Sequence, residues 1–169
     1  SSSVYGSTSK KNFSESDELE DPLSFYSATK QSVERISKYY SKFFKIPSIG
    51  IRFFTCYGPW GRPDLSITQI TDSIIVKKQV TLLNNGKTKR DYTYIDDTVD
   101  GIIKCLSLNM KNKFHEIYNL GTGKTFSILK ISQIIGKLLN IRFKIKLKKH
   151  HPTDMTVTKS NMKKSRKYL

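Results

Sequence analysis

The sequence predicts an α/β fold in which part of the sheet is parallel. Stretches with apolar residues at helical spacing alternate with short apolar or alternating runs typical of strands. Strands that alternate with helices favour parallel pairing. The chain has 169 residues, 37% of them hydrophobic and 26% charged, so it is long enough for one ordinary core and has a globular composition.

The first third of the chain is predicted to contain one helix between two strands. The opening SSSVYG indicates the end of a strand that runs into Gly6, and residues 7–21 form a polar, acidic loop. Pro22 suits a first helical turn, and the apolar residues after it recur at helical spacing, which predicts a helix over 22–45. A buried strand over 48–55 follows.

The rest of the chain continues the alternation. The Gly and Pro residues of GPWGRPD predict a loop at 58–64, and RDYTYI predicts extended chain at 90–95. The other expected elements are a helix over 66–78, a strand over 79–84 with a turn at 84–87, a helix capped by Asp96 or Asp97 that carries Val99, Ile102, Ile103 and Leu106, a strand over 115–120 ending at a Gly121–Gly123 turn, a helix from Thr125 or Ser127 to about Leu139, and an edge strand over 142–148.

The formal charge of +16 raises the alternative of a basic nucleic-acid-binding module. Such a module predicts tight binding that weakens steeply with salt. The basic residues are 24 Lys and 6 Arg, spread along the whole chain, whereas groove recognition depends strongly on Arg. We therefore favour a solvated basic surface and expect no specific nucleic-acid partner.

Other classes of protein are disfavoured by composition. No run approaches the ~18 apolar residues of a membrane span, and the N-terminus lacks the features of a signal peptide. Cys56 and Cys105 suggest reduced cytosolic thiols, and they make no zinc-like spacing with His115, His150 and His151. We expect a cytoplasmic protein without a membrane partner or a metal site.

The segment SFYSATK places Tyr26 and Lys30 four residues apart, where the first helix begins. On a helix these side chains lie on one face, which suits a phenol that works as an acid/base beside a cation. Tyr and Lys are frequent in this chain, so the spacing alone is also compatible with chance. The glycine pattern of a dinucleotide-binding turn, G-x-G-x-x-G, is absent from the sequence.

Four segments in order, SSSVYG, YSATK, RFFTCYGPWGRP and RDYTYIDD, resemble the extended short-chain dehydrogenase/reductase family of nucleotide-sugar epimerases and dehydratases. The likeness is nearest to UDP-glucuronate 4-epimerases and runs from residue 1 to about Asp154. It implies the C-terminal part of a Rossmann-like parallel sheet plus a small α/β substrate-binding region. Residues 1–60 would form the rear of the NAD-binding domain with the catalytic helix, and residues 61–169 mainly the substrate region, with strands returning to the sheet.

The resemblance implies a catalytic role for three residues. Tyr26 takes the place of the family's acid/base, Lys30 lies under the ribose of NAD, and Ser1 bonds the reacting oxygen of the sugar. A free phenol titrates near ~10, so a neighbouring cation is needed to make it a base at neutral pH. The implied reaction oxidises C4 of a UDP-sugar to a ketone with NAD and reduces it again from the other face.

The residues after Ser1 bear on the reaction type. Dehydratases of the family carry acidic residues at the next two positions, where this chain has Ser2 and Ser3. The difference favours simple epimerisation, with Ser2 and Ser3 near the substrate. Residues 1–3 are equally explained as the mere end of a strand.

Further contacts are implied along the chain. Phe53 would touch the nicotinamide region and Thr55 the sugar, while Arg62 would hold the carboxylate of a uronic acid and so favour UDP-glucuronate. A solvated loop arginine is the alternative for Arg62. Arg90 would pair with the diphosphate, whereas Asp91 is expected to shape a turn.

The carboxy-terminal end departs from the family pattern. Relatives have an arginine or glutamine followed by P-G-D that closes over the nucleotide, and this chain has His151, Pro152, Thr153 and Asp154. Asp154 keeps its expected contact with UDP, but the usual arginine or glutamine is missing.

Two alternatives to a UDP-glucuronate 4-epimerase stay open beside the nucleic-acid module. One is UDP-glucose 4-epimerase or another nucleotide-sugar epimerase or dehydratase, and the other is an inactive chain that persists as a binding or oligomerisation piece. Because the glycine turn is absent, we expect residues 1–169 alone to be catalytically inactive. The family usually dimerises through its catalytic helices, so residues 22–45 are expected to form a homodimer interface.

Overall fold

The computed structural model describes residues 1–110, 113–149 and 156–169 and confirms the α/β class. Among the described strands, β1/β10, β10/β5, β2/β7, β3/β6 and β4/β9 pair in parallel and β5/β8 pair antiparallel. In the described segments no helix is long and apolar enough to cross a bilayer.

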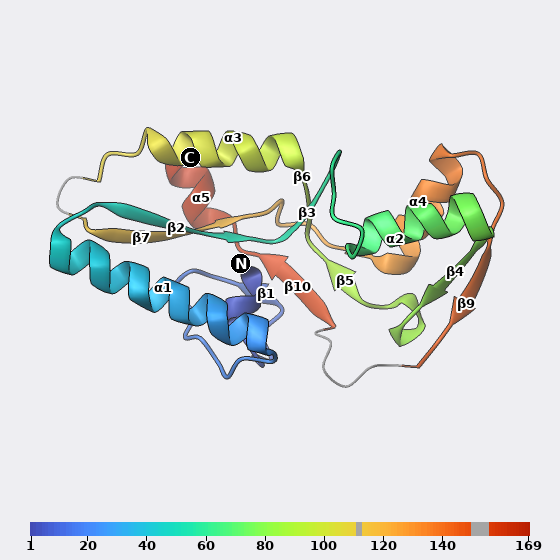
Figure 1. The fold of residues 1–169 in the computed structure, drawn as a ribbon, viewed down its shortest axis with the longest axis horizontal. Helices are drawn as coiled ribbons and strands as arrows, with labels where there is room; N and C mark the ends of the chain where they lie inside the picture. Colours follow the sequence, from blue (N-terminus) through green and yellow to red (C-terminus); the bar gives the residue numbers. More distant parts are fainter. Residues whose placement is uncertain (111–112, 150–155) are drawn as a thin grey trace.

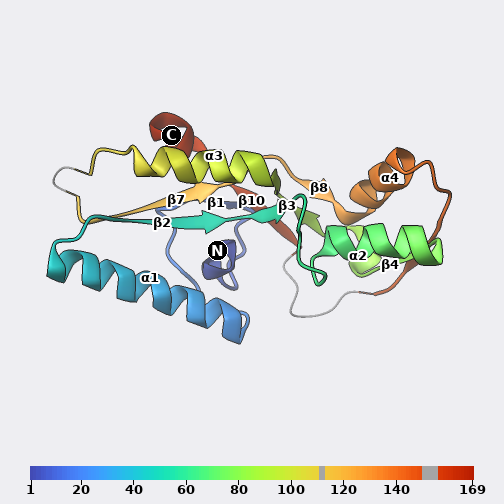
Figure 2. The same cartoon turned by 45° about the horizontal axis from the view of Figure 1, so that its top comes forward.

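A sheet between two helices forms one end of the molecule. β2 (Ser48–Phe53) pairs along its whole length with β7 (His115–Leu120), and both lie where the sequence predicts a strand. α1 (Phe25–Phe44) lies on one face of this pair and α3 (Ile95–Leu106) on the other (Figures 1 and 2). Gly101 allows α3 to approach closely, since a Cβ at this position would lie 2.8 Å from Leu120.

The opposite end of the molecule is a smaller α/β unit, seen at the right of Figure 1. Its core is made by Ile74, Val80 and Leu82, which pack against apolar residues of α4 and of the chain after it. The elements of this unit are α2 (Ser66–Asp72), the π-helical turn η2 (Ser73–Lys77), β4 (Gln79–Leu82), the turn η3 (Asn84–Gly86), α4 (Ile128–Leu138) and β9 (Lys144–Leu147).

Short strands between the two ends carry the chain from one to the other (Figure 1). They are β1 (Asn12–Phe13), β3 (Thr55–Tyr57), β5 (Lys89–Arg90), β6 (Tyr92–Tyr94), β8 (Phe126–Ser127) and β10 (Val157–Ser160). After β10 the chain ends in α5 (Lys163–Tyr168), beside β7.

The expected strand end at the start of the chain is wrong. Residues Ser2–Tyr5 form a 3-10 helix, η1, because the Ser1 side chain accepts a hydrogen bond from the Ser3 N–H at 3.3 Å and caps the turn. Tyr5 packs in a buried cluster with Val4, Phe13 and Phe54.

Two helix starts also differ from the predictions. α1 begins at Phe25, after Pro22, because Ser24 is the N-cap and its side chain accepts from the Ser27 N–H at 3.1 Å. Asp96 does not cap α3, and neither does Asp97: Tyr94 is the N-cap, and both carboxylates lie in the first turn. There they face the positive end of the helix dipole. The predicted capping of α4 by Ser127 is confirmed.

Candidate active site

Tyr26 and Lys30 lie one turn apart at the start of α1, and the structure brings their side chains together. The Lys30 Nζ is 5.3 Å from the centroid of the Tyr26 ring. Tyr26 is 54% exposed, while Lys30 is half-buried. The predicted proximity of the two side chains on one face of the helix is therefore present.

The adjacent face of α1 is fixed to η1 by buried side chains. The Ser27 hydroxyl donates to the Ser3 carbonyl at 2.5 Å. The Gln31 amide donates to the carbonyls of Val4 at 2.9 Å and Glu20 at 2.8 Å. These bonds hold the first two turns of α1 against η1.

Ser1 lies next to β2, with its backbone nitrogen 3.4 Å from the Ile51 carbonyl. Its hydroxyl is 2.9 Å from that of Ser3, and Ser1, Ser2 and Ser3 are all half-buried. The charge of Lys30 acts on the Ser1 nitrogen, so the two residues share one neighbourhood.

Phe53 and Thr55 lie where β2 ends and β3 begins, and both are half-buried. The Thr55 N–H donates to the Asp91 carbonyl at 3.0 Å, which ties this point to the start of β6. Because Ser1 contacts β2 two residues before Phe53, the carboxyl end of β2 gathers Ser1, Phe53 and the start of α1. In parallel sheets this is the edge where ligands bind.

Arg62 is on the exposed loop between β3 and α2. Its guanidinium makes a bidentate pair with the Asp64 carboxylate, with Nε–Oδ1 at 3.0 Å and Nη2–Oδ2 at 2.9 Å. Both side chains are largely exposed, 72% and 65%. The loop turns sharply here, since Trp60 has a positive φ of 63°.

Arg90 is half-buried on β5, and its Nη1 donates to the Lys89 carbonyl at 3.0 Å. It therefore lies in the strands between the two ends of the molecule. Asp154 and His151 lie outside the described residues.

Asp91, expected to shape a turn, is a fully buried acceptor that joins three segments. One carboxylate oxygen accepts from the Thr122 N–H at 2.8 Å and hydroxyl at 2.7 Å. The other accepts from the Gly123 N–H at 2.9 Å and from the Ser160 N–H and hydroxyl at 3.0 and 2.5 Å. This role could not be predicted from the sequence, because the donors are 31 to 69 residues away.

A second group of interacting side chains that the sequence did not predict lies between α1 and β2. Arg52, on β2, makes a bidentate pair with Glu34 of α1, and its guanidinium carbon is 4.7 Å from the centroid of the Tyr5 ring. The Tyr5 hydroxyl donates to Asn119 Oδ1 at 2.7 Å. Burial raises the pKa of the Tyr5 phenol to about 12, against the opposing effect of Arg52. The one feature of the sequence that could have indicated this cluster is an arginine, Arg52, inside an otherwise apolar strand.

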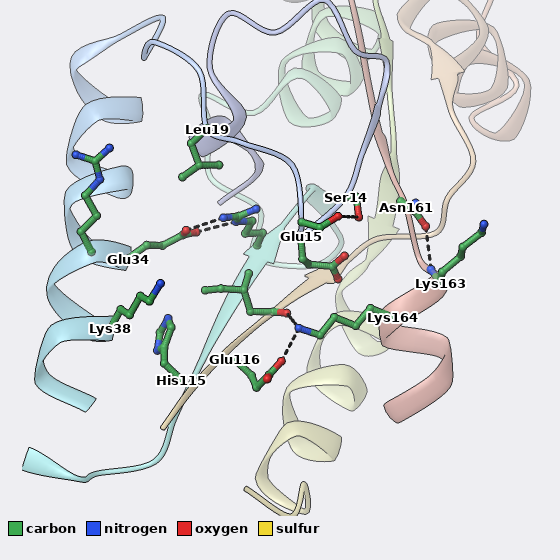
Figure 3. Close-up of a pocket in the computed structure, with 14 residues that line it drawn as sticks. Ser14, Glu15, Leu19, Glu34, Lys38, His115, Glu116, Asn161, Lys163 and Lys164 are labelled. Carbon is green, nitrogen blue, oxygen red and sulfur yellow. Dashed lines mark hydrogen bonds and ion pairs between the residues drawn. The ribbon is translucent and has the colours of Figure 1, made fainter. Parts of the chain in front are cut away.

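A cavity of about 610 Å³ opens between α1 and β7, beside this cluster (Figure 3). Glu34 and Lys38 reach it from α1, and Lys164 reaches it from α5, where the Nζ pairs with Glu116 at 2.6 Å. Neither Tyr26 nor Lys30 lines this cavity. Within the described ranges, no group of three or more His, Cys, Asp or Glu residues is arranged to bind a metal ion.

Comparisons with known proteins identify the family of the chain. Residues 1–121 match the model of the NAD dependent epimerase/dehydratase family. The chain is 38% identical over 169 residues to the uncharacterized protein MJ1055 of Methanocaldococcus jannaschii, covering all of this chain and 51% of that protein. It is 39% identical over 160 residues to UDP-glucuronate 4-epimerase 5 of Arabidopsis thaliana, covering 87% of this chain and 37% of that protein.

Solved structures give the same result. The crystal structure of UDP-glucuronic acid 4-epimerase from Bacillus cereus in complex with UDP-glucuronic acid and NAD superposes with a TM-score of 0.89 at 35% identity, covering 99% of this chain and 52% of that one. The expected Rossmann-like class is confirmed. The chain spans about half the length of MJ1055 and of the Bacillus structure.

Proposed function

We propose, from the premise that this chain belongs to the NAD-dependent epimerase/dehydratase family, that it carries the catalytic helix and the substrate-binding region of a nucleotide-sugar 4-epimerase. The observation that carries the proposal is the Lys30 ammonium held 5.3 Å from the ring of a half-exposed Tyr26, on a helix whose first turns are bonded to the segment after Ser1. The activity belongs to a protein in which these residues meet a glycine-rich NAD-binding turn, because residues 1–169 lack one.

Tyr26 is the acid/base of the proposed reaction. Its phenolate accepts the proton of the C4 hydroxyl group as C4 is oxidised, and its phenol returns that proton when the ketone is reduced from the other face. The Lys30 ammonium stabilises the phenolate by proximity. The Ser1 hydroxyl can donate to the C4 oxygen and accept from it, which keeps that oxygen in place through both steps.

The residues present fit NAD at the carboxyl end of β2. Lys30 would hold the ribose, and Phe53 would contact the nicotinamide. When bound, NAD takes the hydride from C4 and gives it back, so it is regenerated in each cycle. Lys30 is half-buried and lies next to the exposed ring of Tyr26. A hydroxyl group of the ribose could bind to its ammonium there.

UDP-glucuronate is the proposed substrate, and Arg62 the residue that selects it. The Asp64 carboxylate already shows the bidentate geometry that a sugar carboxylate would adopt on Arg62. An exposed ion pair is worth only about 0–1 kcal/mol, so a bound uronate can replace Asp64 at little cost. The similarity to UDP-glucuronate 4-epimerases supports this choice over UDP-glucose.

The remaining contacts follow the same proposal. Ser2 and Ser3, being neutral, favour epimerisation over dehydration, and Thr55 bonds the sugar. Arg90 pairs with the diphosphate of UDP, and Asp154 with the nucleotide.

We also propose a cytoplasmic homodimer that forms through α1. The C-terminal half of α1 carries aromatic side chains that are more than half exposed, and their rings contact one another along the helix: Tyr39, Tyr40, Phe43 and Phe44. An exposed apolar surface of this kind marks an interface. Both cysteines, Cys56 and Cys105, carry free thiols, as a reducing compartment favours.

The test is turnover by the whole protein that contains these residues, with NAD and either UDP-glucuronate or UDP-glucose. We expect conversion of UDP-glucuronate to UDP-galacturonate with the larger kcat/KM. A larger kcat/KM for UDP-glucose would support the alternative substrate, and no turnover of either would contradict the proposed function.

A further inference from the structure

Lys30 has two side chains one turn away on α1. Glu34 follows it by four residues, as Tyr26 precedes it by four, so the three side chains lie along one side of the helix. A carboxylate four residues from a lysine on a helix is close enough to form an ion pair with it. An ion pair with Glu34 would draw the Lys30 ammonium one turn away from the Tyr26 phenol.

Arg52 prevents this competition in the structure. Its Nε donates to Glu34 Oε1 at 3.0 Å and its Nη2 donates to Oε2 at 2.8 Å, so both carboxylate oxygens are engaged. The Arg52 side chain is 5% exposed and that of Glu34 17%, so water screens this pair weakly. The Lys30 Nζ lies instead over the Tyr26 ring, at 5.3 Å.

Arg52 is itself held from a second side. Its guanidinium packs on the ring of Tyr5, a fully buried residue whose hydroxyl group is bonded to Asn119 of β7. The position of Arg52 is therefore fixed by η1 and β7 as well as by α1. A bidentate pair that cannot move away keeps Glu34 from reaching Lys30.

We propose that Arg52 is a positioning residue that binds the Glu34 carboxylate so that the Lys30 ammonium stays with Tyr26. This inference rests on the proposed function, because it concerns the acid/base of that reaction. Arg52 contacts neither substrate nor cofactor and acts through Glu34 and Lys30. Removing Arg52 releases Glu34 to capture Lys30, and Tyr26 then loses its cation.

Other charged residues surround Arg52 and Glu34, and none of them is substituted in the test. Glu15 acts on Tyr5, Asp17 is affected by Arg52, and His115 on β7 is affected by Glu34.

The first experiment uses residues 1–169 labelled with 13C at the tyrosine Cζ. The Tyr26 signal is assigned by its loss in Tyr26→Phe, and its titration is followed by NMR. We expect Arg52→Gln to raise the midpoint, because the ammonium that favours the phenolate then moves to Glu34. Glu34→Gln and Glu34→Gln/Arg52→Gln should not raise it, because neither leaves a carboxylate for Lys30.

This pattern separates positioning from simple stability. Either single substitution breaks a buried ion pair and should destabilise the fold, whereas only Arg52→Gln should raise the midpoint. Arg35→Gln is the matched control, because it removes the same charge from an exposed neighbour of Glu34. Circular dichroism confirms folding, and Arg52→Lys, with a single point of contact for Glu34, replaces Arg52→Gln if that variant does not fold. Equal midpoints in Arg52→Gln, Glu34→Gln and the unchanged chain would overturn the inference.

The second experiment measures kcat/KM against pH in the whole protein. The rise of kcat/KM with pH should move to higher pH in Arg52→Gln and return to its original position in the double variant. If the unchanged protein turns over no nucleotide sugar, the proposed function fails, whatever the NMR titration shows. If it is active and the profile of Arg52→Gln does not move, the positioning role alone is wrong.

Discussion

Replacing Asp91 by Asn should cost the fold much of its stability. Asp91 accepts three backbone N–H groups, from Thr122, Gly123 and Ser160, and two hydroxyl groups, and it is fully buried. An amide offers one acceptor oxygen instead of two. Whichever way it turns, its NH2 group faces at least one of these backbone N–H groups and leaves that donor unsatisfied.

The size of the effect follows from these bonds. An unsatisfied buried donor costs roughly 1–3 kcal/mol, and bonds to a charged acceptor are about twice as strong as neutral ones. With one donor lost and the remaining bonds weakened, Asp91→Asn should lower the free energy of unfolding by about 3–5 kcal/mol. Because a domain is stable by only about 5–15 kcal/mol, the change is large.

The assay is urea unfolding of residues 1–169 followed by circular dichroism at 222 nm. Asp96→Asn is the matched control, since it makes the same chemical change in an exposed side chain at the start of α3 and should cost no more than about 1 kcal/mol. If Asp91→Asn lowered the free energy of unfolding by less than the control does, the account of Asp91 as the joint between β6, the Gly121–Gly123 turn and β10 would be refuted.

Two further predictions concern the substrate loop and the dimer. Arg62→Ala in the whole protein should raise KM for UDP-glucuronate about 10-fold, or release decarboxylated product, without changing KM for UDP-glucose, and unchanged uronate kinetics would rule out the role of Arg62. Phe43→Glu should convert the whole protein to a monomer in sedimentation velocity, since Phe43 is 64% exposed on α1, and an unchanged oligomer would place the interface elsewhere.

The elements that the sequence predicted well are those with a long periodic pattern. α1, β2, β7 and α4 lie within a few residues of their predicted bounds, because their apolar spacing and caps are local features. β1 was not predicted, since it has two residues inside a polar loop, and its burial of Phe13 depends on a partner strand far along the chain. The strand β10 and the helix α5 were hidden in the same way within the basic tail.

The candidate site divides along the same line. The pairing of Tyr26 with Lys30 follows from helical spacing, so it could be predicted before the fold was known. The roles of Asp91 and Arg52 could not be predicted, because their partners come from distant segments of the chain. The sequence alone does not show which charged residues are buried. The 3-10 turn at Ser2–Tyr5 depends on the Ser1 cap, which a strand-like SSSVYG does not reveal.

The most direct test of the account is the turnover of Tyr26→Phe in the whole protein with NAD and UDP-glucuronate. Removing one hydroxyl group from an exposed ring leaves the packing of α1 unchanged, so nucleotide-sugar binding should stay within a few-fold. The account predicts a fall in kcat of about 10²–10⁴-fold, the usual contribution of a positioned acid/base. A variant that keeps more than a tenth of the original kcat would contradict the claim that this phenol transfers the proton.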